Sequence, residues 1–189
     1  MARNDLTEYR RKRDFGRTAE PRGGESAPGA EPRFVVQIHD ASSTHFDFRL
    51  EADGVLKSWA IPKGPSTDPQ DKRLAMPTED HPLEYRDFEG VIGEGEYGAG
   101  PVIIWDEGTY HVEGRPVAEA LDRGHLSFRL DGTKLHGGYA LTRFRENAWL
   151  LVKRADRHTS SRGTPDPQRA RSTRTGRTLR QVRAEDGEG

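Results

Sequence analysis

The sequence predicts a mainly β protein, an antiparallel barrel or sandwich with short peripheral helices and disordered termini. Between residues 34 and 153, apolar and polar residues alternate over many short runs, and a period of two is typical of half-buried strands. Turn residues separate these runs at close spacing, as in antiparallel barrels and sandwiches. With 21 Gly, 12 Pro and a hydrophobic content of 32%, part of the chain is expected to lie outside a packed core.

The first segment, residues 1–33, is expected to be an N-terminal arm. Residues 4–13 can form a short helix with Asn4 or Asp5 as its N-cap. Residues 22–32 are rich in Gly, Pro, Ser and Ala, a composition typical of a linker. The arm therefore combines a short helix with a Gly/Pro-rich connection to the folded domain.

Net charge distinguishes the remaining two segments. Residues 34–156, the expected β domain, hold 14 basic and 21 acidic residues, which gives a net charge of −7. Residues 157–189 hold 8 arginines and 4 acidic residues, a net charge of +4, with almost nothing apolar, and so predict a basic disordered tail. Residues 1–33 are also basic, with a net charge of +2. Basic terminal segments on an acidic domain are compatible with binding of a polyanion by these segments, and equally with termini that have no binding role.

Strands are expected in the domain wherever an alternating run lies between turn residues. The first two runs flank the small polar loop 40–44. Further turns are expected at residues 53–54, 106–108 and 131–132, each of which contains Gly. The strands predicted in this way are 34–39, 45–50, 55–61, 73–76, 102–105, 109–112, 125–130, 139–144 and 149–153.

One helix and one glycine-rich stretch interrupt the strands. Residues 116–123 form the expected helix, with Pro at the first position and Gly after the end. The spacing Gly93-x-Gly95-x-x-Gly98 matches the dinucleotide-binding fingerprint, but that motif must open a helix, and here a strand follows. We therefore expect tight turns between strands, not a nucleotide cofactor.

Composition excludes several functional classes. The chain has no cysteine, so disulfides, thiolate metal sites and a Cys nucleophile are ruled out. The N-terminus lacks the apolar core of a secretory signal. No run approaches the roughly 18 apolar residues of a membrane span. The sequence thus predicts a cytoplasmic protein with no membrane partner.

The hairpin formed by the first two strands carries the most distinctive side chains. If its loop closes symmetrically, His39 faces His45 and Gln37 faces Asp47, with cross-strand Cβ atoms about 4.5–5.5 Å apart. The two histidines and Asp47 then share one face, with Arg49 one step further along. Two imidazoles and a carboxylate suit Mn, Fe, Co or Zn, and three protein ligands leave positions open for water or substrate, as in catalytic sites.

Three other interpretations of this cluster remain open at the level of sequence. The residues can be solvated side chains on the outer face of a sheet. They can be the facial triad of a non-haem Fe(II) oxygenase, although such enzymes usually place the third ligand far downstream. They can also belong to a non-catalytic module that binds DNA ends.

Several separated motifs resemble the 3′-phosphoesterase domain of bacterial DNA ligase D. The most specific of them is His39-x5-His45-x-Asp47-x-Arg49, preceded by Gln37. The resemblance covers about residues 9–156 and includes RDF-x-x-T-x-EP, WAIPKGPS, TEDHPLEY, GEYGAGPV-x-IWD and WLLVK-x-x-D. It implies a small closed antiparallel β-barrel with its active site on the concave surface.

The resemblance also implies a set of functional residues. His39, His45 and Asp47 correspond to the ligands of a divalent metal, typically Mn²⁺, with other transition metals such as Co²⁺ as alternatives. Arg49 and His81 correspond to groups that contact the scissile phosphate. Further catalytic or supporting positions are Lys63, Arg73, Tyr85, Gln37 and Glu79. The arm positions that act on the terminal nucleoside are Arg13, Asp14 and Glu20.

The implied reaction is the healing of 3′ ends of DNA or RNA-tipped DNA. A diester that holds a 3′-terminal ribonucleoside is cleaved first, and the remaining 3′-phosphate is then removed to leave a 3′-OH. The chain contains no Lys-x-Asp-Gly ligase motif, so we expect a stand-alone monomer. A separate ligase, polymerase or end-joining factor is then its expected partner.

Simpler roles compete for several of these positions. Lys63 can be a solvated loop lysine, Arg73 a surface charge and Tyr85 a core aromatic. The other histidines of the domain, His111, His125 and His136, match no motif and are expected to be structural.

Overall fold

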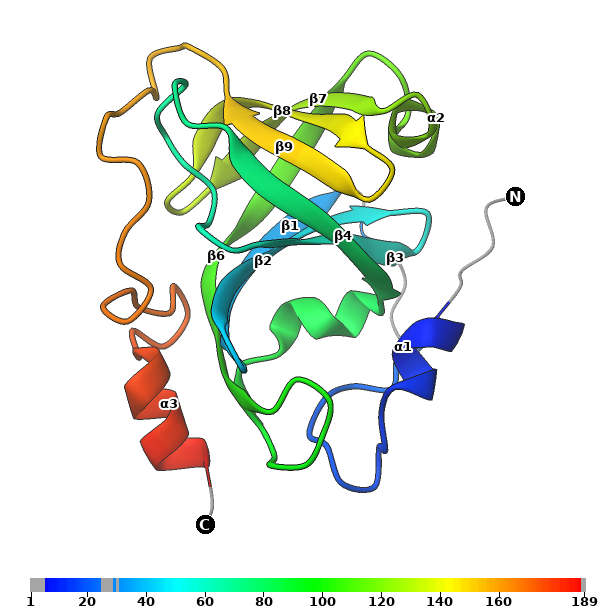
Figure 1. Cartoon of the computed structure of the whole chain (residues 1–189), viewed down its shortest axis with the longest axis vertical. Helices are drawn as coiled ribbons and strands as arrows, with labels where there is room; N and C mark the ends of the chain where they lie inside the picture. The colour runs from blue at the N-terminus through cyan, green and yellow to red at the C-terminus, as the bar shows by residue number, and fades with distance from the viewer. Residues whose placement is uncertain (1–5, 25–28, 30, 188–189) are drawn as a thin grey trace.

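A computed structural model describes residues 6–24, 29 and 31–187 of the chain. Eight strands form a closed antiparallel barrel in the order β1-β2-β3-β4-β9-β8-β7-β6, and pairing between β6 and β1 closes the ring (Figure 1). The mainly β class, the closed antiparallel barrel and the short peripheral helices expected from the sequence are confirmed. Strand bounds are β1 Arg33–Asp40, β2 Thr44–Ala52, β3 Val55–Ile61, β4 Arg73–His81, β5 Gly90–Ile92, β6 Gly100–Glu113, β7 His125–Gly132, β8 His136–Arg145 and β9 Ala148–Lys153.

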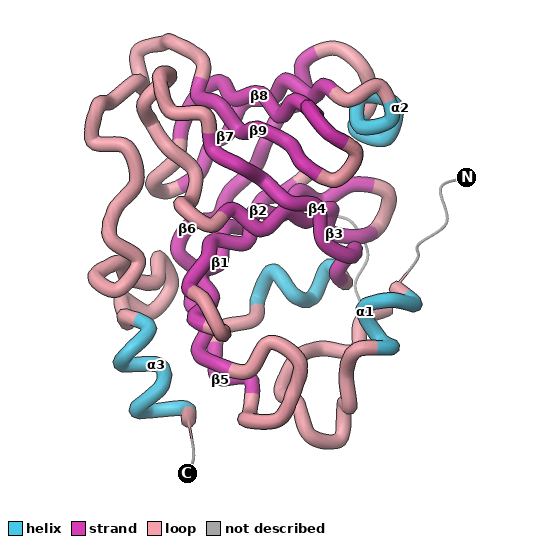
Figure 2. Tube along the Cα trace, in the orientation of Figure 1, coloured by secondary structure: helices cyan, strands magenta, loops and turns pink. Residues whose placement is uncertain are grey.

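Helices lie only at the periphery of the barrel (Figure 2). They are α1 Thr7–Arg11, α2 Val117–Asp122, α3 Leu179–Asp186 and a 3-10 turn, η1, Leu83–Asp87. The predicted helix at 116–123 is confirmed by α2. None of the described helices is long and apolar enough to span a membrane.

The prediction of a turn at 106–108 is wrong. One continuous strand, β6, runs through these residues and pairs with both β1 and β7. A shift in the β1–β6 register absorbs one extra residue, since Val36 pairs with Asp106 while Gln37 pairs with Ile104. Gly108 is needed for close strand approach, because a Cβ there would lie 2.1 Å from the Asp131 carbonyl oxygen.

The turn predicted at 131–132 is also displaced, because β7 continues to Gly132 and the chain reverses over 133–135. The buried carboxylate of Asp106 holds that reversal. It accepts hydrogen bonds of 2.8–3.0 Å from the backbone N–H groups of Thr133, Lys134 and Leu135. A long-range side-chain contact therefore determines where this hairpin turns.

Strand β4 is longer than the predicted 73–76 and reaches His81. Its first three residues pair with β9, and its later residues pair with β3. This extension carries Glu79 and His81 alongside the β1–β2–β3 sheet, where the predicted site lies.

Two apolar clusters hold the molecule together. The larger fills the barrel with inward side chains of nearly all its strands. The smaller lies outside the barrel and joins the arm to η1, because Tyr9 is fully buried there with Leu83, Tyr85 and Phe88. The described part of the arm is thus packed against the barrel; the N-caps expected at Asn4 and Asp5 lie outside the described residues, and Leu6 occupies that position.

The tail differs most from its prediction. Within the described residues, 157–187 are ordered along one side of the barrel and end in α3, on the opposite side from α1 (Figure 1). Although apolar residues are few, Ala170, Leu179 and Val182 are buried in the main cluster. Helix α3 begins with a complete capping box between Thr178 and Gln181. Disorder is therefore the wrong prediction for this stretch, because its few apolar residues are buried and polar contacts such as Thr173 N to Ile104 O join it to the barrel.

Candidate active site

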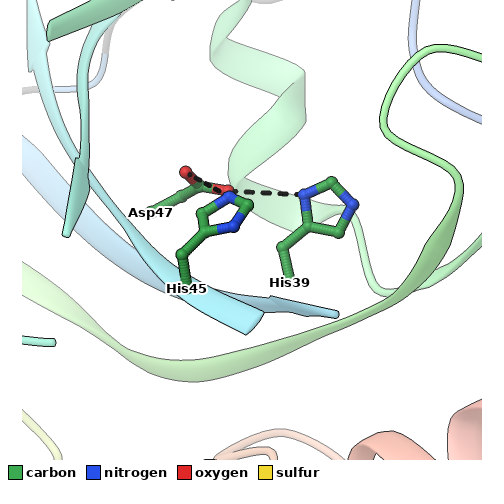
Figure 3. A group of neighbouring side chains, drawn as sticks. All are labelled: His39, His45 and Asp47. Carbon is green, nitrogen blue, oxygen red and sulfur yellow. Dashed lines mark ion pairs between the residues drawn. The ribbon is translucent and has the colours of Figure 1, made fainter. Parts of the chain in front are cut away.

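The β1–β2 hairpin has the register expected from its sequence. His39 pairs with His45 and Gln37 pairs with Asp47. Figure 3 shows the two imidazoles and the carboxylate converging on one point. Asp47 Oδ1 lies 3.2 Å from His45 Nε2, and Asp47 Oδ2 lies 3.7 Å from His39 Nδ1. One hairpin thus supplies all three side chains of the cluster.

Backbone carbonyls determine which ring nitrogens face the carboxylate. His39 Nε2 lies 2.5 Å from the Gly98 carbonyl oxygen, and His45 Nδ1 lies 3.2 Å from that of Ser43. Because a carbonyl oxygen only accepts, these nitrogens carry the proton in a neutral ring. The other nitrogen of each ring therefore points a bare lone pair toward Asp47. Such carbonyl contacts are typical of metal-ligating histidines.

Three converging Lewis bases need a positive charge between them. Burial alone would lower the pKa of His45, but Asp47 raises it above its ordinary value, since a proton there relieves the repulsion. A divalent cation meets the same requirement. The ligand atoms lie within 4.8 Å of one another, close to the span of roughly 4 Å that two bonds of 2.0–2.2 Å allow. The donor set therefore fits a transition metal.

Arg49 borders the cluster as a buried cation. Its Nη2 lies 3.4 Å from Asp47 Oδ2, and its Nε donates to the Gln37 side-chain oxygen at 2.7 Å. Nη1 donates to Ser58 Oγ at 2.9 Å. The side-chain amide of Gln37 is itself held in place, because its Nε2 donates to the backbone carbonyls of Tyr85 and Phe88. Burial alone would raise the pKa of Asp47, but Arg49 and the two histidines hold it well below its ordinary value.

His81 is held as a neutral imidazole. Burial and the nearby charges of Arg49 and Arg13 lower its pKa well below the ordinary value. Its Nδ1 lies 2.9 Å from the Glu79 carbonyl oxygen, so Nδ1 carries the proton and Nε2 is bare. The ring also packs edge-on against Tyr85, with 4.7 Å between centroids.

The N-terminal arm supplies a charged network beside His81. Arg13 Nε donates to Glu20 at 2.9 Å, and the Tyr85 hydroxyl donates to the same carboxylate oxygen at 2.7 Å. Burial and Glu20 raise the pKa of Tyr85 well above its ordinary value, so the phenol stays protonated. Burial alone would raise the pKa of Glu79, but hydrogen bonds and the charges of Lys12 and Arg13 lower it.

These groups surround a cavity of about 340 Å³. Most residues predicted for the site line it: His39, His45, Asp47, Arg49, Glu79, His81, Tyr85 and Arg13. Gln37 and Glu20 lie directly behind this lining, bonded to Arg49 and to Arg13. The barrel and the arm therefore contribute jointly to one concave surface.

Three predicted site residues lie elsewhere. Lys63 is exposed in the connection after β3, and Arg73 binds the Lys63 carbonyl and Asp71. Asp14 is exposed and its carboxylate accepts from the Gly16 backbone N–H. None of these three side chains lines the cavity. His125, expected to be structural, lies outside it too and contacts Thr142 and Ser127.

Several contributors escaped sequence reasoning. Ser58 pairs with Arg49 across the β2–β3 hairpin, and counting outward from the 53–54 turn would have found it. Lys12 and Tyr97 form a hydrogen-bonded pair at the cavity, and the Gly98 carbonyl orients His39. The glycine-rich stretch was predicted only to form turns, and no local signal in it predicts the contact with His39.

The similarity of this chain to known proteins covers most of the barrel and not the cavity residues alone. The family model of the DNA ligase D 3′-phosphoesterase domain matches residues 37–143. The chain is 54% identical over 157 residues to the multifunctional non-homologous end joining protein LigD of Pseudomonas aeruginosa, covering 80% of this chain and 19% of that protein. It is 48% identical over 151 residues to the LigD protein of Mycobacterium tuberculosis, covering 77% and 19%.

A third relative, LigD of Mycolicibacterium smegmatis, is 44% identical over 157 residues, which cover 80% of this chain and 21% of that protein. The chain spans about a fifth of the length of the curated relatives it matches. The matched region contains His39, His45 and Asp47, the three residues that could hold a metal ion. The chain therefore belongs to the DNA ligase D 3′-phosphoesterase domain family.

Proposed function

We propose that this chain is a divalent-metal phosphoesterase that heals 3′ ends of DNA or RNA-tipped DNA. In this proposal it removes a 3′-terminal ribonucleoside and then the 3′-phosphate, leaving a 3′-OH. The observation that carries the proposal is the convergence of two imidazole lone pairs and a carboxylate beside buried Arg49. Family membership adds that such domains are hydrolases of phosphate esters.

His39, His45 and Asp47 would hold the metal, with Mn²⁺ as the proposed ion and Co²⁺ as an alternative, because imidazole ligands favour transition metals over Mg²⁺. A bound ion of this kind polarises a phosphoryl oxygen and lowers the pKa of a coordinated water. Three protein ligands would leave coordination positions open for the phosphoryl oxygen and for the water.

Arg49 is suited to bind the non-bridging oxygens of the phosphate. Its guanidinium is fixed by Gln37 and Ser58 before substrate arrives, so little conformational entropy is lost on binding. Three of its five N–H groups are not engaged by these two side chains. They donate charge-assisted hydrogen bonds, which are about twice as strong as neutral ones.

His81 is suited to move a proton at Nε2. In the free protein this atom is bare, because Nδ1 donates to the Glu79 carbonyl. Phosphate bound at Arg49 adds negative charge nearby and raises the proton affinity of Nε2. Protonated Nε2 then donates to the leaving oxygen as a general acid.

The remaining predicted roles belong to the same proposal. Arg13, with Glu20 and Glu79, positions the terminal nucleoside in the diester step, and Tyr85 orients Glu20. The roles expected of Lys63, Arg73 and Asp14 stay predictions. Because none of these side chains lines the cavity, they would have to contact the part of the substrate that extends outside it. The proposed substrates are DNA ends, the proposed partners a ligase, polymerase or end-joining factor, and the proposed location the cytoplasm.

The central test removes one ligand. His45→Ala should lower turnover of a 3′-phosphate oligonucleotide by more than 100-fold, about 2.7 kcal/mol in barrier, because two ligands do not hold the ion in place. His125→Ala is the matched control, a histidine outside the cavity, and should stay within twofold of wild type. Residual turnover of His45→Ala above a tenth of wild type would show that His45 is not a ligand.

The same assay separates the two rival functions. Removal of metal with a chelator should abolish turnover, and Mn²⁺ should restore it better than Mg²⁺. Turnover that requires 2-oxoglutarate would instead indicate a non-haem iron oxygenase. Tight binding of DNA ends without metal-dependent turnover would indicate a non-catalytic end-binding module.

A further inference from the structure

An exposed aromatic ring stands at the rim of the cavity. Among the large hydrophobic side chains of the described residues, Tyr97 is the most exposed at 51%, and it lines the cavity. The comparably exposed Leu74, Met76 and Phe144 do not. Single exposed apolar side chains are common on protein surfaces, but this ring is exposed where a substrate bound in the cavity would meet it.

The backbone holds Tyr97 in this position. It lies in the loop of residues 93–99 between β5 and β6, which is closed by hydrogen bonds from Glu96 N to Gly93 O and from Ala99 N to Glu96 O. The next residue, Gly98, has a φ of +74°, and its carbonyl contacts His39 Nε2. The ring is therefore one residue away from a group that orients a metal ligand.

The N-terminal arm holds the loop from the other side. Glu96 pairs with Arg17 at 3.1 Å, and the Tyr97 hydroxyl accepts from Lys12 Nζ at 3.3 Å. Lys12 Nζ also lies 4.7 Å from the ring centroid, and the Arg13 guanidinium lies 5.6 Å from it. In Figure 1 this loop lies beside the chain that follows α1. An aromatic face flanked by cations is the combination that binds nucleobases next to their phosphates.

We propose that Tyr97 forms a nucleobase subsite, on which the base of the 3′-terminal ribonucleoside stacks during the diester step. The inference rests on the proposed function and adds a substrate contact to it. The base is assigned to the leaving nucleoside because Tyr97 is tied to the arm, whose Arg13 borders the same cavity. Every base has an aromatic face, so the subsite binds all four bases.

The simplest alternative is that Tyr97 only ties the arm to the loop through its hydroxyl. Tyr97→Phe distinguishes the two roles, because it keeps the ring and removes the hydrogen bond to Lys12. Tyr97→Ala removes both. Phe144→Ala is the matched control, an aromatic 47% exposed and outside the cavity.

The experiment measures kcat/KM of the full chain with Mn²⁺ on three oligonucleotides. The first ends in a ribonucleoside, the second in the same ribose without its base, and the third in a 3′-phosphate. Stacking on one base is worth about fivefold to 150-fold in affinity. Tyr97→Ala should lose at least that lower factor on the first substrate relative to the third, while Tyr97→Phe and Phe144→Ala stay within twofold of wild type.

The base-free substrate completes the test. Wild type should discriminate against it by about the factor that Tyr97→Ala loses, and Tyr97→Ala should show no such discrimination. Equal discrimination in both proteins, or a Tyr97→Phe defect as large as that of Tyr97→Ala, would overturn the subsite. Failure of wild type to hydrolyse the 3′-phosphate would instead overturn the proposed function.

Discussion

The two ends of this chain are both basic, yet they contribute to the molecule in opposite ways. In the arm, Arg13 forms a buried pair with Glu20, with side chains 5% and 0% exposed, at the edge of the cavity. In the tail, Arg174 pairs with Glu107 and Asp87 while its side chain remains 34% exposed. The arm arginine thus belongs to the site, and the tail arginine joins the tail to the acidic barrel.

Local composition does not distinguish these two roles, but burial does. Charge pairs in water are screened and contribute little, whereas a buried charge must keep its partner. The tail also docks through apolar residues, with Leu179 and Val182 almost fully buried. Its arginines at 174, 177 and 183 face barrel carboxylates, which reduces the positive charge available for nucleic acid. Three substitutions examine this contrast.

Arg13→Ala should have the largest effect. It leaves the Glu20 carboxylate buried without its cation, which typically destabilises a fold by about 3–5 kcal/mol. Urea denaturation of the variant and wild type gives the difference in free energy of unfolding. Restoring neutrality with the double variant Arg13→Met/Glu20→Gln should recover part of the loss. A change below about 1 kcal/mol in the single variant would mean that water reaches Glu20.

Leu179→Ala should have the next largest effect. The side chain is 1% exposed against the barrel cluster, and truncating such a leucine typically costs about 2–5 kcal/mol. Turnover of a 3′-phosphate per folded molecule should change less than twofold, since no residue of α3 lines the cavity. Leu74→Ala, at a leucine 40% exposed on β4, is the control and should alter stability by less than about 1 kcal/mol. A Leu179→Ala protein as stable as wild type would indicate an undocked tail.

Arg174→Ala should have the smallest effect. Exposed ion pairs contribute about 0.2–1 kcal/mol and are screened by salt. The loss in unfolding free energy should therefore shrink between low and physiological salt. A loss comparable with that of Arg13→Ala, unchanged by salt, would remove the distinction between the two basic ends.

Sequence reasoning succeeded where a contact is local. Alternation and a five-residue loop placed His39 opposite His45, and the hairpin register confirms it. The same counting from the turn at 53–54 leads to Ser58 as the partner of Arg49. In both cases the interacting residues are joined by a short, regular hairpin, so strand periodicity determines which side chains meet.

Reasoning from sequence failed where distant residues compete with a local signal. The 106–108 stretch has the composition of a turn, but all three residues pair with β1, and Gly108 also pairs with β7, which keeps the chain extended. Buried Asp106 then sets the turn that follows β7. The tail has the composition of a disordered segment, but Leu179 and Val182 find a barrel face that only the folded domain provides.

The sequence by itself determined the β class, the central hairpin and the placement of His39, His45 and Asp47 on one of its faces, because the register of a hairpin depends on contacts within a few residues of chain. The domain boundaries drawn at residues 33 and 156 remain predictions. Only the tertiary structure decided that Arg13 meets Glu79 and that Glu20 meets Tyr85, since these contacts join segments more than 60 residues apart. Burial then converts these pairings into a neutral His81 and a protonated Tyr85, because desolvation acts only once the barrel and arm have closed around them.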